Sequence, residues 1–116
     1  INAYKYYNND TRVYLYNWLV NNYDPAEKLV YNDKDLKDIF EKIKINGVRD
    51  LNYFDNYSKA LIVIYDPGEE EKKFLKKNGS LLNEEVFFDS KWKLGSDIVV
   101  YRYESSSNSS GCGCGR

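Results

Sequence analysis

The chain has 116 residues, enough for one domain with a single modest hydrophobic core. Its formal net charge is −1 with 30% charged residues, which argues against the basic face of a duplex nucleic-acid binder, so we expect no nucleic-acid partner. It contains no histidine, which excludes serine–histidine and cysteine–histidine nucleophile systems within the chain, and we expect no cofactor. No apolar stretch is long enough to span a membrane.

The segment 8–25 predicts a docking helix. Asp10 or Thr11 can cap a first helical turn, and Pro25 disfavours helical backbone at the residue before it, so the helix should end near Tyr23. Helical spacing relates Arg12, Leu15, Tyr16, Leu19 and Tyr23. An alternation of Tyr14, Tyr16, Trp18 and Val20 leaves a strand as the rival interpretation. The distance between cap and proline favours the helix.

The next segments predict a strand and a second helix. Lys28–Tyr31 is short, apolar and β-prone, and Asn32 or Asp33 can cap a helix after it. The apolar stripe of that helix consists of Leu36, Ile39, Phe40 and Ile43. Asn46 and Gly47 predict a left-handed stop, and residues 48–54 are ambiguous between a short strand and a turn.

The second half predicts a buried strand, a helix and a hairpin. Ala60–Tyr65 is a run of six apolar residues, typical of a strand buried on both faces. After a turn at residues 66–68, Glu69–Asn78 has acids in its first turn and lysines in its last, as a helix dipole favours. Leu81–Asp89 and Asp97–Glu104 predict an antiparallel hairpin. The expected fold class is therefore α/β, a small mixed sheet with a C-terminal antiparallel hairpin, packed by about three helices.

The predicted domain covers residues 1–104, and residues 105–116 predict a flexible Ser/Gly/Cys tail. Within that tail, Cys112 and Cys114 are the candidates for disulfide or redox chemistry, either exposed or paired with another chain. Two thiolates do not complete a zinc site, so no metal site is expected there. The chain has no methionine, so we expect Ile1 to follow an upstream segment.

Other candidate sites are few. Asp66 follows the buried strand, where ligands usually approach an open α/β sheet, but Asp-Pro-Gly is also what a tight turn requires. The acids at 69–71 should point in different directions on a helix, which disfavours calcium binding. One of the arginines (Arg12, Arg49, Arg102) could bind an anionic headgroup. The twelve tyrosines fit a β-containing core, with a carbohydrate-stacking surface as the alternative.

Four Asn-x-Ser/Thr sequons are present, at Asn9, Asn56, Asn78 and Asn108. With 13 Asn and 10 Ser/Thr among 116 residues, chance predicts about one. The excess favours an exported, extracellular glycoprotein, although an Asn-rich chain with a serine tail also produces sequons readily.

Several of these segments together resemble a known family. The start Asp10-Thr11-Arg12, the helix with Trp18-Leu19, Asn22 before Pro25 and the strand at Lys28–Val30 are similar to the segment after the last membrane span in archaeal and bacterial polytopic glycosyltransferases. These enzymes are related to the dolichyl-phosphate-mannose protein mannosyltransferases and use polyprenyl-phosphate sugars. The likeness continues at Gly47-Val48, Ala60–Pro67 and Asp97–Tyr103.

The resemblance implies a soluble domain on the outer face of the membrane, tethered through an upstream membrane domain of the same polypeptide. It also implies that the catalytic acid lies among the absent membrane helices, so no catalytic residue carries over to this chain. We therefore expect a non-catalytic extracytoplasmic accessory domain, with carbohydrate as a candidate partner. The alternatives are an exported, N-glycosylated subunit of a cell-surface assembly and a small intracellular α/β enzyme or regulator with a site near Asp66.

Overall fold

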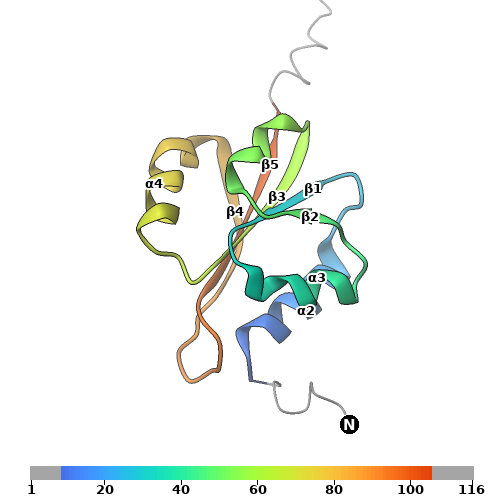
Figure 1. The fold of residues 1–116 in the computed structure, drawn as a ribbon, viewed down its shortest axis with the longest axis vertical. Coiled ribbons are helices and arrows are strands. Elements are labelled where there is room, and N and C mark those ends of the chain that lie inside the picture. The colour runs from blue at the N-terminus through green and yellow to red at the C-terminus, as the bar shows by residue number, and fades with distance from the viewer. Residues whose placement is uncertain (1–8, 106–116) are drawn as a thin grey trace, which may run out of the picture.

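The computed structural model describes residues 9–105. In chain order the elements are α2 (Thr11–Asn22), β1 (Lys28–Tyr31), η1 (Lys34–Leu36), α3 (Lys37–Lys42), β2 (Gly47–Val48), η2 (Leu51–Asn56), β3 (Lys59–Tyr65), α4 (Glu69–Asn78), η3 (Gly79–Leu81), β4 (Leu82–Phe88) and β5 (Ile98–Glu104). The α-helices and the 3₁₀-helices η1–η3 surround one mixed sheet (Figure 1), which confirms the expected α/β class. Apart from Ser105, the predicted tail lies outside the described residues, and with it Asn108, Cys112 and Cys114.

The sheet has five strands in the order β2-β1-β3-β5-β4. β1 pairs in parallel with β2 and β3, and β5 pairs antiparallel with β3 and β4, so the predicted C-terminal hairpin is confirmed. β3 and β5 lie side by side over their whole length, from Lys59 opposite Glu104 to Tyr65 opposite Ile98. Because side chains alternate along a strand, β3 contributes to a core on each face, which is why its sequence is uniformly apolar.

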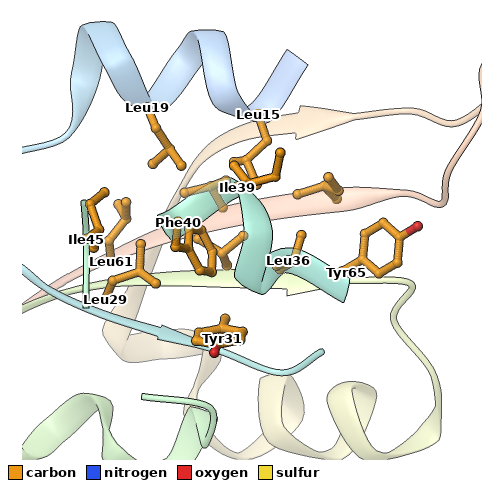
Figure 2. Packing of buried hydrophobic residues seen from close by; sticks show 13 residues of the cluster. Leu15, Leu19, Leu29, Tyr31, Leu36, Ile39, Phe40, Ile45, Leu61 and Tyr65 are labelled. Atoms are coloured by element: carbon orange, nitrogen blue, oxygen red, sulfur yellow. The ribbon is translucent and has the colours of Figure 1, made fainter. Parts of the chain in front are cut away.

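Helices α2 and α3 cover one face of the sheet. Figure 2 shows Leu15 and Leu19 of α2 above the α3 side chains, which in turn lie over the strands. The rings of Tyr31 and Phe40 meet edge to face at 4.8 Å between centroids. The predicted helix is therefore confirmed and the rival strand is wrong. The apolar side chains of α2 pack in the core on this face of the sheet.

The opposite face is covered by α4 and η2. Phe54 packs edge to face against Phe74, with centroids 5.6 Å apart, and against Tyr103 at 4.8 Å. In the ambiguous segment 48–54, Val48 is the last residue of β2, and η2 begins at Leu51. Leu51 and Phe54 of η2 are both buried. Residues three apart lie on the same side of a 3₁₀-helix, so both side chains reach this core.

The prediction of a left-handed stop at residues 46–47 is wrong. The residue with positive φ after α3 is Lys44, at 59°, whereas Gly47 lies in β2. A Cβ at Gly47 would lie 2.6 Å from the Leu29 side chain and 3.0 Å from the ring of Tyr31. Gly47 is therefore required for the close approach of β2 to β1, not for a turn.

Candidate functional site

In open α/β sheets, ligands usually bind beyond the carboxyl ends of the parallel strands. From β1 the chain moves outward to β2 and then back across β1 to β3, so a topological switch point lies between the ends of β1 and β3. The predicted candidate Asp66 follows β3 directly, is exposed and has φ 54°. Its backbone N–H donates to the carbonyl of Asp97 at 2.8 Å. The main chain of Asp66 thus joins the end of β3 to the start of β5.

The switch point itself is filled by Asn32. Its Oδ1 accepts the backbone N–H of Tyr65 at 2.8 Å, while its Nδ2 donates to the Tyr65 carbonyl at 2.9 Å and to Glu71 Oε2 at 3.0 Å. Glu71 Oε1 in turn accepts the N–H of Gly68 at 2.8 Å. Burial would raise the pKa of Glu71, but these hydrogen bonds hold it below its ordinary value. Asn32 thereby closes the gap that a ligand would enter.

The sequence offered Asn32 and Asp33 as alternative helix caps. The structure assigns the cap to Asp33, whose carboxylate accepts the N–H of Asp35 at 2.8 Å. Asn32 is therefore free for its long-range bonds to Tyr65 and Glu71. No local pattern distinguishes these roles, because both residue types cap helices equally well.

A cavity of about 170 Å³ adjoins Asn32. Its lining consists of Asn32, Arg49, Asp50, Leu51, Asn52, Glu70, Glu71 and Phe74. Three carboxylates face a single guanidinium there, so the cavity disfavours an anionic headgroup. Within residues 9–105, no cluster of three or more His, Cys, Asp or Glu side chains could hold a metal ion.

Arg102 of β5 forms an ion-pair network on the α2 face. Its Nε donates to Glu27, which is 5% exposed, and its Nη1 donates to Glu85 at 2.9 Å. The Nη2 donates to the carbonyl of Asn22 at 3.1 Å, and the guanidinium lies 5.9 Å from the centroid of Trp18. The hydrogen bond to Glu27 raises the pKa of Arg102 despite burial.

A bulge in β4 between Glu84 and Val86 makes Glu85 the extra residue there. The neighbouring cavity of about 310 Å³ is lined by Asp24, Glu27, Lys59, Arg102, Tyr103 and Glu104. Since all three nitrogens of the Arg102 guanidinium donate to protein oxygens, we assign it to joining α2, β4 and β5 and not to ligand binding.

Residues 10–12 and 94–96 form a junction where the described chain begins, which we call the entrance junction. The Asp10 carboxylate caps α2 by accepting the N–H of Arg12 at 2.8 Å. It also accepts two hydrogen bonds from the Arg12 side chain, from Nε at 3.0 Å and from Nη2 at 2.8 Å. Burial alone would raise the pKa of Asp10, which is 1% exposed, but these bonds and the guanidinium charge hold it below its ordinary value.

The second half of the entrance junction comes from the loop between β4 and β5. The buried Thr11 hydroxyl donates to the carbonyl of Ser96 at 2.6 Å. The Thr11 N–H donates to the Leu94 carbonyl at 3.0 Å, and the Leu94 N–H donates to the Asn9 carbonyl at 2.8 Å. Gly95, at φ 80°, leaves room for this contact.

The three described sequons differ in their surroundings. The Nδ2 of Asn9 donates to the Trp92 carbonyl at 2.7 Å, and that of Asn78 donates to the Phe74 carbonyl at 3.1 Å. Asn56 is exposed at the end of η2, and its side chain has no hydrogen-bond partner among residues 9–105. Asn56 therefore offers the most accessible amide for a glycan.

No family model matches the chain, and neither a curated protein nor a solved structure matches it significantly. Across residues 9–105, none of the helices has the length and apolar character that crossing a bilayer requires.

Proposed function

We propose that this chain is a non-catalytic extracytoplasmic accessory domain of a membrane-bound, glycosyltransferase-like protein. The observation that carries the proposal is the entrance junction. The three residues with which the resemblance begins, Asp10, Thr11 and Arg12, cap α2 and join it to the β4–β5 loop. Two further resembling segments, 60–67 and 97–103, cover most of β3 and β5, which form the longest uninterrupted pairing in the sheet.

The entrance junction holds residues 9–12 against the β4–β5 loop. Side-chain and backbone bonds hold Thr11 to the loop, and the backbone of Asn9 is bonded there too. Residues 9–12 therefore have little rotational freedom relative to the rest of the domain. Such a restraint suits a domain that must stay at a set position beside a membrane-embedded active site, where it covers that site or helps to hold a carbohydrate acceptor.

The test is the sequence of the intact precursor, obtained from the reading frame upstream of Ile1 or by mass spectrometry of the native protein. The proposal expects several hundred upstream residues with multiple apolar spans. A cleavable signal peptide of about 15–30 residues directly before Ile1 would overturn it and would favour an exported surface subunit.

A further inference from the structure

The β4–β5 loop, residues 89–97, is the most prominent exposed apolar feature of the described chain and has no role in the fold's core. Trp92 is 85% exposed and Leu94 is 55% exposed, and both alternate with the cationic residues Lys91 and Lys93. A single exposed apolar side chain is ordinary, but Trp92 and Leu94 lie together on one short loop, and a contiguous exposed apolar patch marks an interaction surface.

The exposure of Trp92 is imposed by a structured loop. The Lys93 N–H donates to the Ser90 carbonyl at 2.9 Å, and the Ser90 N–H donates to Asp97 Oδ1 at 2.8 Å. Trp92 adopts φ 63°, a conformation that costs a non-glycine residue free energy, and its carbonyl accepts a hydrogen bond from Asn9. The fold therefore holds the indole outward.

Of the two cations of the loop, Lys91 is exposed and Lys93 is half-buried. Both loop carboxylates accept backbone N–H groups of the loop, Asp89 from Lys91 at 2.7 Å and Asp97 from Ser90. The ammonium of Lys93 lies 5.4 Å from the ring centroid of Tyr14. Lysines beside an exposed tryptophan and leucine are the composition that protein segments show at the interface of a lipid bilayer.

We propose that the β4–β5 loop docks onto a bilayer surface that carries anionic headgroups. Trp92 and Leu94 enter the interfacial region and Lys91 faces lipid phosphates, while Lys93, over the Tyr14 ring, adds positive charge beside them. The location supports this occupant, because the loop and the start of α2 lie at the same end of the molecule and the end of β5 lies at the opposite end (Figure 1). The assignment of this end to the membrane side rests on the proposed function.

The docking surface is small, so it should bind weakly by itself. Two apolar side chains give marginal, reversible binding, and each lysine near an anionic surface strengthens it by about fivefold. A tether upstream of Asn9 would raise the local concentration of lipid and make this weak contact effective. The loop would then set the orientation of the domain on the membrane.

The experiment anchors the 116-residue chain to vesicles through an N-terminal hexahistidine tag and nickel-chelating lipid. The vesicles contain phosphatidylcholine with or without phosphatidylglycerol. We expect the tryptophan emission to shift to shorter wavelength and to be quenched by brominated acyl chains, more strongly with phosphatidylglycerol. Trp92→Phe should abolish most of the shift of the tethered protein, because the other tryptophan, Trp18, lies in α2. Lys91→Glu with Lys93→Glu should abolish the additional shift that phosphatidylglycerol gives.

Matched controls are Val20→Ser, which removes an apolar side chain that is 59% exposed elsewhere, and Lys76→Glu in α4. Both should leave the emission shift of the tethered protein unchanged, and circular dichroism should show that every variant is folded. Emission and quenching that do not depend on the bilayer, or equal effects of the controls, would overturn the lipid proposal. So would an emission shift without lipid that grows with protein concentration, which would indicate that a second copy of the chain covers Trp92. The vesicle result is independent of the precursor sequence, so either proposal can fail while the other stands.

Discussion

Alanine at Gly95 should disrupt the entrance junction. Gly95 has φ 80°, and alanine in the left-handed region costs about 1–2 kcal/mol. The added Cβ would lie 2.6 Å from Thr11 Oγ1 and 2.7 Å from Asp10 Oδ1, so both side chains must move. The move weakens the bond from Thr11 to Ser96 and the ion pair of Asp10 with Arg12, each worth roughly 1–2 kcal/mol. Reduced freedom of the unfolded chain offsets about 0.4–1 kcal/mol. The net destabilisation is about 2–4 kcal/mol.

Gly79→Ala is the matched control. Gly79 has φ −58°, and a Cβ there would meet nothing within 4 Å, so alanine should stabilise the chain by about 0.4–1 kcal/mol. Urea titrations followed by circular dichroism measure both free energies. For a domain of this size Gly95→Ala should lower Tm by roughly 8–16 °C. If Gly95→Ala matched the wild-type stability within about 0.5 kcal/mol, the close contact inferred at the entrance junction would be wrong.

Three further predictions concern charge and modification. Asp10→Asn should remove part of the pH dependence of the free energy of unfolding. The lowered folded-state pKa of Asp10 contributes stability above its unfolded pKa of about 3.9, and that contribution is lost as pH falls through the folded pKa. Acid titrations of unfolding should therefore converge for the two proteins at low pH, and parallel curves would contradict the assignment. Arg102→Ala leaves Glu27 buried without its ion-pair partner and should destabilise by about 3 kcal/mol in urea titrations, while adding Glu27→Gln should restore part of the loss; no restoration would refute the buried-charge argument. In a secretory host that glycosylates asparagine, Asn56→Gln should remove a glycan mass that Asn78→Gln leaves in place, and the reverse pattern would show that side-chain exposure does not govern occupancy.

Elements with strong local signals could be predicted from sequence. The helix at 11–22 has a cap at Asp10 and a proline shortly after its end, and β3 has an uninterrupted apolar run. The helix at 69–78 carries its charges in the order that its dipole favours. In each case the information lies within a few residues of the element, so no knowledge of the neighbours is needed.

The candidate site could not be predicted in the same way. Asp66 follows β3 as expected, but the switch point beside it is closed by Asn32, which the sequence marked only as one of two helix caps. Likewise, no local pattern shows that Arg102 forms an ion pair with Glu27, which is 75 residues away in sequence. These roles depend on strand order, which is decided by pairing between distant segments.

The sequence by itself determined the class of fold, the approximate extent of the helices and strands, and the absence of a histidine-based site, because composition and short-range periodicity carry that information. Only the tertiary structure decided that Gly47 serves close packing and that Lys44 takes the left-handed turn. It also decided that Gly95 makes room for Asp10 and Thr11 and that Trp92 is held in solvent. The physical reason is that a residue's cost or benefit at such positions is set by atoms that the chain brings near only after folding.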